Sequence, residues 1–241
     1  MYATIVIPAH NEEDCLGPLL VEIIDTVSAL PVREIVVVDD GSTDKTAEST
    51  IAAAGDNAML RIVRHSRRQG QSRALLTGIR AASNDLIVTL DADGQNDPAD
   101  LGALFAAYAE RQAQTTRLMI AGQRLGRRDT LMRRVSSRIA NRVRAALLND
   151  NVRDTGCSLK LFRRQDFLEL PFFDHIHRFL PAMMKASGVQ VVLVDVSHRA
   201  RAAGRSKYGI WDRLWVGLQD LVGVRWLMKR QIANVELEDV F

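Results

Sequence analysis

The chain has 241 residues, of which 47% are hydrophobic and 25% are charged, and its formal net charge is +3. This composition is typical of a folded protein and excludes a largely disordered chain. The length is sufficient for one sizeable domain with a small appended element. The net charge is too small to indicate a partner by itself.

The sequence shows neither a signal peptide nor a membrane-spanning segment. A strand pattern starts at the N-terminus, with no basic segment followed by an apolar core. No stretch reaches the roughly 18 uncharged apolar residues that a spanning helix needs. Cys15 and Cys157 are the only cysteines, and this pair matches neither a zinc site nor a disulfide framework. The chain is therefore expected in a reducing, cytoplasmic compartment.

The first half of the chain alternates strand and helix patterns. Strands are expected where Val, Ile and Leu form nearly continuous runs, as in strands that are buried on both faces. The predicted strands are Ala3–Pro8, Glu34–Asp39, Met59–Arg64, Asp85–Leu90 and Leu118–Gly122. The predicted helices are Glu13–Ala29, Asp44–Ala54, Gln71–Ala82 and Pro98–Gln112. This alternation predicts an α/β fold with a doubly wound, mostly parallel sheet.

The second half is less regular. The predicted elements are a basic helix at Leu131–Leu148, a strand at Ser158–Phe162, a helix at Phe179–Ser187, a strand at Val189–Val196 and a basic loop at Arg199–Lys207. No internal repeat and no clear linker interrupts this order. We therefore predict one domain over residues 1–207, followed by amphipathic helices over residues 208–241.

The clearest polar motif is Asp91-Ala92-Asp93, which follows an apolar strand. Two carboxylates one residue apart at a strand end can converge on one hard cation while the strand holds them in place. Mg²⁺ and Mn²⁺ prefer oxygen ligands and leave positions open for water and phosphate. Gln95 can add a carbonyl oxygen to Asp91 and Asp93. A solvated turn would carry the same residues, so this metal interpretation depends on the motifs that accompany it.

Two further strand ends carry polar residues. Asp39-Asp40-Gly41-Ser42-Thr43-Asp44 follows one apolar run, and Pro8-Ala9-His10-Asn11-Glu12 follows another. Ser42 or Asp44 can cap the next helix, but capping does not explain the two carboxylates at the strand end. One of these can accept hydrogen bonds from a base or a ribose. Ligands of doubly wound sheets lie beyond the carboxyl ends of the strands, which is where these motifs fall.

Taken together, the motifs resemble a known enzyme family. Ile5 to Glu12, the Val-Val-Val-Asp-Asp-Gly-Ser block and the Asp-Ala-Asp triplet are similar to family-2 glycosyltransferases with the nucleotide-sugar-binding A-type fold. Gly122-Gln123-Arg124, Asp154 to Lys160, and Arg201 followed by Gly204 to Gly209 resemble the polyprenyl- and dolichyl-phosphate sugar synthases, including dolichol-phosphate mannosyltransferase. Several motifs in the same order are much more specific than any one of them.

The resemblance implies an inverting, metal-dependent enzyme. It would transfer a sugar from a nucleotide diphosphate, such as GDP-mannose or a UDP-sugar, to a polyprenyl or dolichyl phosphate. The implied nucleotide-sugar-binding residues are Pro8, His10 (often Tyr in the family), Glu12, Val38, Asp40, Asp91, Ala92, Asp93, Arg124, Arg201 and Lys207. The implied catalytic residues are Asp91, Asp93, Arg124 and Asp154, and the implied metal ligands of Mg²⁺ or Mn²⁺ are Asp91, Asp93 and Gln95.

This reaction agrees with the residues that the chain has and lacks. A phosphate monoester is mostly ionised near neutral pH, because its second pKa is about 6, so this acceptor needs no general base. Correspondingly, we find no Ser/His/Asp or Cys/His arrangement. Two anions must instead be brought together, and residues 124–164 hold twelve Lys or Arg against three Asp. Arg124, Arg201, Arg205 and Lys207 are expected to bind phosphate, with Arg133 and Arg134 nearby.

The stretch Tyr208–Gln231 indicates a membrane surface. It contains all three tryptophans of the chain, apolar residues at helical spacing, and Lys229 and Arg230 near its end. Tryptophan prefers the headgroup region and basic residues attract anionic lipid, so we expect a pair of interfacial helices interrupted near Gly223. The predicted location is the cytoplasmic face of the inner membrane. Packing on the domain or on a second subunit explains the pattern almost as well, and moving the product across the bilayer would need a separate membrane-spanning partner.

Other functions remain as alternatives. The main one is a family-2 transferase that acts on a glycan or another hydroxyl acceptor. The motifs from Arg201 to Gly209 argue against this alternative. An oxidoreductase would need a Gly-x-Gly-x-x-Gly turn after the first strand, which is absent. An inactive membrane adaptor would not need Asp91 and Asp93.

Nucleic acid is not an expected partner, because the basic stretch has no interleaved aromatic residues. For His175 and His177, packing or an acceptor contact is favoured over a metal site.

Overall fold

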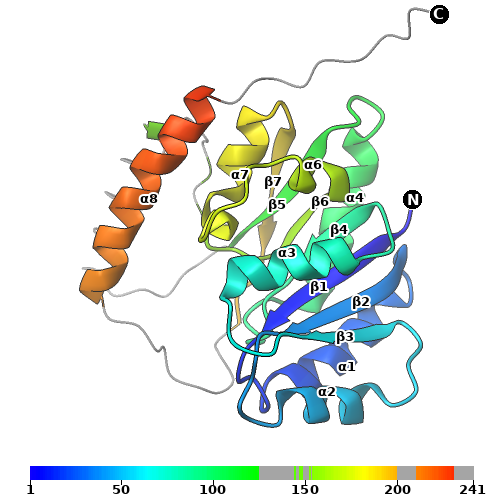
Figure 1. Cartoon of the computed structure of the whole chain (residues 1–241). Coiled ribbons are helices and arrows are strands. Elements are labelled where there is room, and N and C mark those ends of the chain that lie inside the picture. Colours follow the sequence, from blue (N-terminus) through cyan, green and yellow to red (C-terminus); the bar gives the residue numbers. More distant parts are fainter. Residues whose placement is uncertain (125–143, 145–146, 149–151, 153, 200–209, 231–241) are drawn as a thin grey trace, which may run out of the picture.

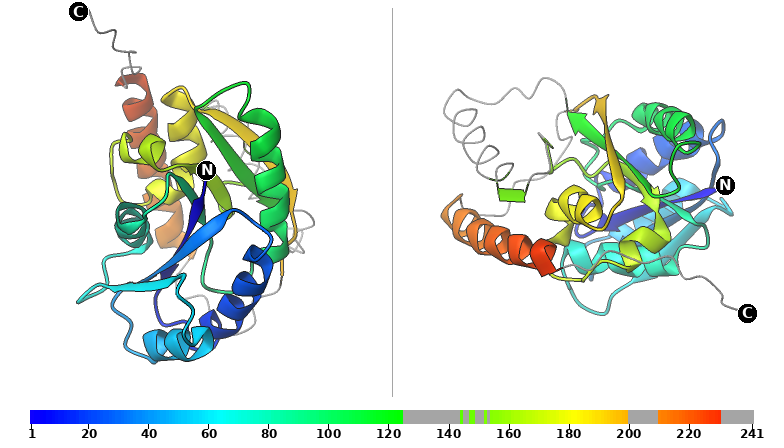
Figure 2. Two further views of the ribbon diagram at one scale, coloured as in Figure 1. Left: turned by 90° about the vertical axis from the view of Figure 1, so that its right-hand side faces the viewer. Right: turned by 90° about the horizontal axis from the view of Figure 1, so that it is seen from above.

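The chain forms a seven-stranded sheet with helices on both faces (Figures 1 and 2). In this computed structural model, residues 1–124, 144, 147–148, 152, 154–199 and 210–230 are described, without the side chains of 210–218. The strands are β1 (Ala3–Ala9), β2 (Val32–Asp39), β3 (Leu60–Arg64), β4 (Leu86–Thr89), β5 (Leu118–Arg124), β6 (Lys160–Arg163) and β7 (Gln190–Val196). Their order is β3-β2-β1-β4-β6-β5-β7, and only β6 runs antiparallel to its neighbours.

Helices connect most of the strands. They are α1 (Leu16–Val27), α2 (Thr46–Ala54), α3 (Gln71–Ala81), a 3₁₀ turn η1 (Pro98–Asp100), α4 (Leu101–Arg111), α6 (Arg164–Leu168), α7 (Ile176–Ala186) and α8 (Ile210–Arg230). The predicted doubly wound, mostly parallel α/β fold is confirmed. The expected helix Leu131–Leu148 and the expected loop Arg199–Lys207 lie mostly outside the described residues.

Each face of the sheet carries its own apolar layer. Alternate residues of a strand point to opposite faces, so Ile5 and Ile7 of β1 pack with α1 and α4, whereas Val6 packs with α3, α6 and α7. Because both faces are covered, the strands are apolar at nearly every position, which is the pattern seen in the sequence. The result is a rigid platform that fixes where each strand ends.

Helix α3 approaches the sheet unusually closely because it carries Gly78. A Cβ atom at Gly78 would lie 2.4 Å from Cγ1 of Val6 and 3.0 Å from Cγ2 of Val38, which is too close for a carbon atom. The missing side chain therefore lets α3 pack directly on β1 and β2.

One expectation about the helices is wrong, and one short helix was not anticipated. Helix α8 runs without a break from Ile210 to Arg230, so the predicted interruption near Gly223 does not occur. A helical glycine costs only about 1 kcal/mol relative to alanine, and burial of Leu221 and Val224 against α7 offsets that cost. The five-residue helix α6 was not predicted, because it is too short to show a helical period.

Candidate functional site

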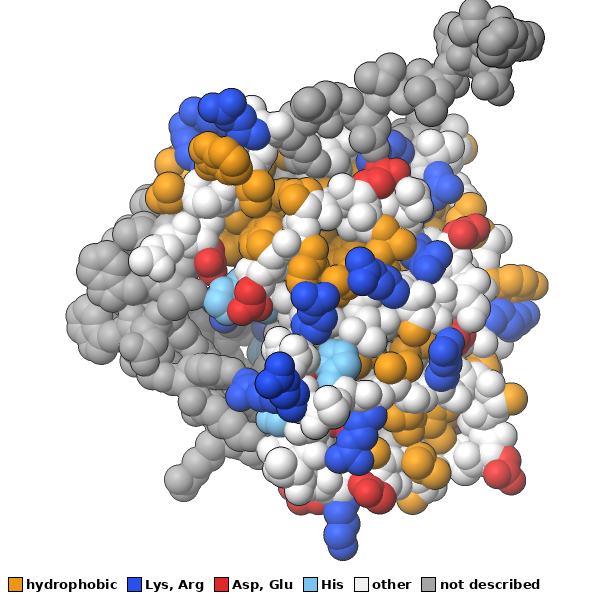
Figure 3. Space-filling view, in the orientation of Figure 1, with side chains coloured by type: hydrophobic (Ala, Val, Ile, Leu, Met, Phe, Trp, Pro, Cys, Tyr) orange, Lys and Arg blue, Asp and Glu red, His pale blue; other side chains and the backbone are white. Residues whose placement is uncertain are grey.

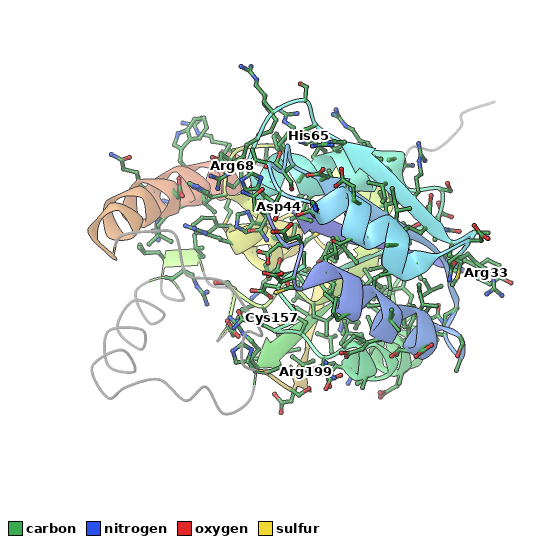
Figure 4. The ribbon with its side chains drawn as sticks, turned by 90° about the horizontal axis from the view of Figure 1, so that it is seen from below. Arg33, Asp44, His65, Arg68, Cys157 and Arg199 are labelled. Atoms are coloured by element: carbon green, nitrogen blue, oxygen red, sulfur yellow. The ribbon has the colours of Figure 1, made fainter. Side chains whose placement is uncertain are left out.

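Polar motifs from both halves of the chain meet at one edge of the sheet. The strands β1, β2 and β4 are parallel and end at this edge, as does β5, whereas the antiparallel strand β6 begins there. Seen from below in Figure 4, His65, Arg68 and Asp44 lie near one another, and Cys157 and Arg199 lie together on the opposite side.

The loop after β4 is held by residues from the second half of the chain. The Ser158 hydroxyl accepts a hydrogen bond from the backbone N–H of Asp91 at 3.1 Å and donates one to Oδ1 of the buried Asn96 at 2.6 Å. Ser158 thus connects residues on both sides of Asp93 in the loop between β4 and η1. On the other side, Nε2 of Gln71 donates to Oδ1 of Asp91 at 2.8 Å.

The surroundings of Asp91 disfavour its charged form. Burial and the nearby charge of Asp93 raise the pKa of Asp91 to about 6, although Ser158, Lys160 and Arg124 act in the opposite direction. Lys160 is itself buried, which lowers its pKa, and its ammonium group donates to the Cys157 carbonyl. A divalent cation would relieve the repulsion between the two carboxylates.

Arg124 and Asp154 form a bidentate ion pair beside this loop. Nε of Arg124 lies 2.5 Å from Oδ2 of Asp154, and Nη2 lies 2.8 Å from Oδ1. The two side chains are only 10% and 14% exposed. The Asp154 hydrogen bonds raise the pKa of Arg124 further, so its positive charge is permanent. Asp154 therefore orients a fixed cation at the end of β5.

Asp40 is bound by the loop that follows β3. Its Oδ1 accepts hydrogen bonds from Nδ1 of His65 at 2.7 Å and from the Gln69 N–H at 2.8 Å, and its Oδ2 accepts from the Gly70 N–H at 2.7 Å. Burial raises the pKa of Asp40, but these hydrogen bonds outweigh burial and hold that pKa below its usual value. Asp40 therefore anchors the 65–70 loop in this structure.

The other residues expected at the nucleoside lie around the ends of β1 and β2. Pro8 and Val38 are opposite each other in the β1–β2 ladder, and both are buried. Val38 packs against α3, so only its backbone could reach a ligand. Nδ1 of His10 lies 3.0 Å from the Asp40 carbonyl oxygen, and the Glu12 N–H donates to Thr46 at 2.9 Å. Ala92 is buried.

Gly41 allows the β2 and β3 loops to touch, and replacing it should be costly. It has a φ of +64°, and a Cβ atom there would lie 2.6 Å from the backbone of Arg67 and Arg68. We expect Gly41→Ala to lower the free energy of unfolding by about 2–4 kcal/mol, as backbone strain adds to the clash. Urea unfolding measures this. Gly94→Ala is the matched control, because its φ is +71° but nothing lies within 4 Å, and an equal loss in both variants would contradict the clash.

The remaining predicted residues are either bonded within the fold or not described. Arg201 and Lys207, with Arg133, Arg134 and Arg205, lie outside the described residues. Nδ1 of His175 lies 2.8 Å from Oδ2 of Asp220 on α8, and Nδ1 of His177 lies 2.9 Å from Oγ of Ser72 on α3. Within the described part of the chain, no three His, Cys, Asp or Glu side chains group as a metal site. The Asp91–Asp93 pair is thus the candidate site for a cation that protein carboxylates and a substrate phosphate would coordinate together.

The structure adds site residues that the sequence did not reveal. Gln71, Asn96 and Lys160 contact or neighbour Asp91, and His65 holds Asp40. Ser158 and Lys160 belong to a motif that was recognised, but without roles. His65 directly follows β3, and the rule that ligands bind beyond strand ends could have drawn attention to it. Gln71 carries no local signal, since it is one polar residue at a helix start.

The sequence profile of the glycosyl transferase family 2 matches residues 4–170, which include the loops after β1, β2 and β4 and the Arg124–Asp154 pair. The chain belongs to glycosyl transferase family 2. Within the family, it is 34% identical over 233 residues to a dodecaprenyl-phosphate galacturonate synthase of Rhizobium johnstonii, covering 94% of this chain and 67% of the relative. It is 32% identical over 208 residues to an undecaprenyl-phosphate 4-deoxy-4-formamido-L-arabinose transferase of Photorhabdus laumondii, covering 85% of this chain and 62% of that protein.

These relatives confirm the predicted resemblance to polyprenyl-phosphate sugar synthases, although the chain spans only about two thirds of their length. Similarity to solved structures confirms the A-type fold. Glucosyl-3-phosphoglycerate synthase from Mycobacterium tuberculosis, in complex with Mn²⁺, uridine diphosphate and phosphoglyceric acid, superposes with a TM-score of 0.67 at 22% identity, covering 97% of this chain and 80% of that chain. The same enzyme has been solved with Mg²⁺ and uridine diphosphate, also with a TM-score of 0.67 at 22% identity, covering 93% of this chain and 79% of that one.

Proposed function

We propose that the chain transfers a sugar from a nucleotide diphosphate sugar to a polyprenyl phosphate, with inversion at the anomeric carbon. The observation that carries this proposal is the Asp91–Asp93 carboxylate pair at the end of β4, beside the largely buried Arg124–Asp154 ion pair. The two relatives are named for transfer to prenyl phosphates, which supports the acceptor. Nucleotide-linked galacturonate and formamido-arabinose are therefore candidate donors, in addition to the GDP-mannose or UDP-sugar expected from the sequence.

The donor set of the site suits Mg²⁺ or Mn²⁺. Asp91 and Asp93 offer carboxylate oxygens and Gln95 offers an amide oxygen, which are the ligands that such hard cations prefer. Neighbouring structures of the fold contain Mn²⁺ or Mg²⁺ with uridine diphosphate, which supports the same use here. The bound cation would neutralise the charge that builds on the departing diphosphate oxygen.

The chain's own residues would position the two anionic substrates. Ser158 and Gln71 fix the Asp91 backbone and carboxylate, and so determine where the diphosphate lies. Arg124, oriented by Asp154, supplies a permanent positive charge for a donor or acceptor phosphate. The acceptor is already ionised near neutral pH, so no residue has to remove a proton from it. In-line attack from the face opposite the diphosphate inverts the anomeric carbon.

Radiolabelled nucleotide sugars test the function directly. The chain is incubated with Mn²⁺ and UDP-galacturonate, UDP-4-deoxy-4-formamido-L-arabinose or GDP-mannose, together with undecaprenyl phosphate or a free glycan. We expect label in the organic phase with undecaprenyl phosphate, and loss of that label when EDTA is added. Label that appears only in the glycan would show that the hydroxyl-acceptor alternative is correct instead.

The raised pKa of Asp91 predicts how activity depends on pH and metal. Below pH 6 the proton increasingly competes with the cation for this carboxylate, so the apparent Kd for Mn²⁺ should rise by about tenfold per pH unit. Transfer at limiting Mn²⁺ should fall in the same range, and a hundredfold excess of Mn²⁺ should move the acid limb to lower pH. Initial rates from pH 4.5 to 8 at two Mn²⁺ concentrations measure this, and an acid limb that ignores Mn²⁺ would contradict it.

The proposed acceptor lies in a membrane, and α8 offers a surface for docking there. None of the described helices is long and apolar enough to cross a bilayer. The exposed side of α8 instead presents Val222 (64% exposed) and Trp226 (59% exposed), followed by Lys229 and Arg230. Figure 3 shows hydrophobic side chains and Lys or Arg side chains together on the face that includes α8. This combination suits an anionic membrane surface.

Membrane docking predicts a specific loss on changing α8. Trp226→Ser should weaken binding to phosphatidylglycerol vesicles by about tenfold or more, since burial of a large apolar side chain contributes about 1.5–3 kcal/mol. Removing all residues after Tyr208 should abolish binding. Vesicle co-sedimentation measures both. Ile51→Ser, at an equally exposed apolar residue (58%) on α2, is the control and should bind like the wild type. Unchanged sedimentation of the truncated chain would refute the docking surface.

A further inference from the structure

Arg199, which follows β7, is tied to the loop that carries Asp93. Its backbone N–H donates to the Gln95 carbonyl oxygen at 3.0 Å. Its guanidinium group forms a bidentate pair with Asp97, with Nε 3.0 Å from Oδ2 and Nη2 2.8 Å from Oδ1. In Figure 4, Arg199 lies on the same side of the site as Cys157. One residue therefore holds two positions of this loop, one through its backbone and one through its side chain.

Asp97 is also the residue at which the next element begins. Its Oδ1 accepts a hydrogen bond from the Ala99 N–H at 2.9 Å, and its carbonyl oxygen accepts from the Asp100 N–H at 3.1 Å. The Ser197 hydroxyl and N–H both donate to Oδ2 of Asp100, at 2.6 and 2.9 Å. The segment 197–199 therefore binds the loop at the point where it enters η1 and α4.

Glu22 of α1 also binds the guanidinium group of Arg199. Its Oε2 accepts a hydrogen bond from Nη1, and this bond raises the pKa of Arg199, so the positive charge is permanent. A planar guanidinium group has its N–H donors in a fixed fork and can therefore serve two carboxylates at once. Arg199 thus connects parts of the chain that are far apart in sequence, namely α1, the loop before η1 and the segment after β7.

This network is too exposed to determine whether the chain folds. The side chains of Arg199, Glu22 and Asp97 are 40%, 47% and 22% exposed, and water and salt screen such ion pairs. A local effect can still be large, because a loop between two secondary-structure elements depends on side-chain contacts for its order. Ser158 binds Asn96 of this loop, and Arg199 binds the residues directly before and after Asn96.

We propose that Arg199 is a positioning residue, which holds the loop through Gln95 and Asp97 and so fixes how Asp93 and Gln95 present their side chains. Arg199 itself need not touch either substrate. The effect on transfer rests on the proposed function, whereas the order of the loop is a property of the chain alone. Removal of a contact that orients a metal ligand typically lowers metal affinity by about 10–100-fold.

Hydrogen exchange tests the order of the loop without any metal or substrate. Arg199→Gln should speed exchange of the amides that bond to Asp97 by about tenfold, while the urea midpoint stays that of the wild type. Arg111→Gln is the matched control, since Arg111 is also 40% exposed and pairs with a neighbouring carboxylate, Glu110. The control should change neither quantity.

Metal and substrate binding distinguish positioning from a purely structural role. By titration calorimetry, Arg199→Gln should raise the Kd for Mn²⁺ in the presence of UDP by about tenfold, and KM for undecaprenyl phosphate should stay within about twofold. Glu22→Gln should have a smaller effect in the same direction, and none when Arg199→Gln is already present, because Glu22 acts through Arg199. Arg199→Lys keeps the charge but loses the bidentate fork, so it should restore Mn²⁺ affinity only in part.

The proposal is overturned if Arg199→Gln leaves exchange and Mn²⁺ affinity unchanged, if its urea midpoint falls enough to explain both changes, or if the effects of Glu22→Gln and Arg199→Gln add. Any of these results in a chain that transfers sugar would leave the proposed function intact. Conversely, if the wild-type chain transfers no sugar to any prenyl phosphate, the proposed function fails, and faster exchange in Arg199→Gln would still show that Arg199 orders the loop.

Discussion

The Asp93→Ala variant is expected to lose at least about 100-fold in kcat/KM while unfolding at the same urea concentration as the wild type. The loss corresponds to removing several kcal/mol of charge stabilisation from the departing diphosphate. Stability should be preserved because, among the residues that the structure describes, the Asp93 side chain makes just a local hydrogen bond, in which its Oδ1 accepts from the Gln95 N–H at 3.1 Å. Removing this carboxylate also relieves its repulsion of Asp91.

A binding measurement makes this result specific to the metal. The wild type should gain thermal stability from UDP only when Mn²⁺ is present, and Asp93→Ala should lose that gain. A ligand at one hundred times its Kd contributes about 2.7 kcal/mol, so the shift is easily measured. Asp56→Ala, in the exposed turn before β3, serves as the control. Normal turnover by Asp93→Ala would exclude the proposed metal site.

The second large effect is expected at the Arg124–Asp154 pair. Asp154→Asn should lower the free energy of unfolding by about 3–5 kcal/mol, because it leaves the largely buried Arg124 without its counter-charge. Transfer should fall as well, since the guanidinium group loses the carboxylate that orients it. The effect on activity should appear mainly in kcat, measured in steady-state assays at a temperature where the variant remains folded.

An exposed ion pair provides the comparison. Nε of Arg111 and Oε1 of Glu110 lie 3.7 Å apart, and the two side chains are 40% and 72% exposed. Glu110→Gln should change stability by less than about 0.5 kcal/mol, because water and salt screen exposed pairs. Equal destabilisation by Asp154→Asn and Glu110→Gln would show that burial of Arg124 does not matter, contrary to the structure.

The sheet could be predicted well from the sequence, because strands that are buried on both faces are apolar at nearly every position. Runs such as Ile5–Ile7 and Ile35–Val38 are apolar at every position, and only strands within a covered sheet need that composition. The same pattern located Asp91 and Asp93, since polar residues directly after such a run must lie at an edge. The order of these polar motifs along the chain then indicated the family.

Contacts between distant parts of the chain could not be predicted in the same way. Asp40 is held by His65 and the Gln69 and Gly70 amides, and Asp91 by Ser158, through side-chain geometry that leaves no periodic signal. The continuous helix α8 was missed for a related reason. Gly223 argues for a break locally, but packing of its neighbours on α7 decides the outcome.

The reversed direction of β6 has a consequence for how the chain reaches its native state. Strand β4 can pair with β1 early, but its other edge stays open until β6, more than sixty residues later in sequence, inserts between β4 and β5. Such a distant pairing is slow to form, and an open strand edge favours association with other chains. During synthesis, the first half of the chain therefore has an aggregation-prone strand edge at β4 that is covered only when β6 of the second half pairs with it.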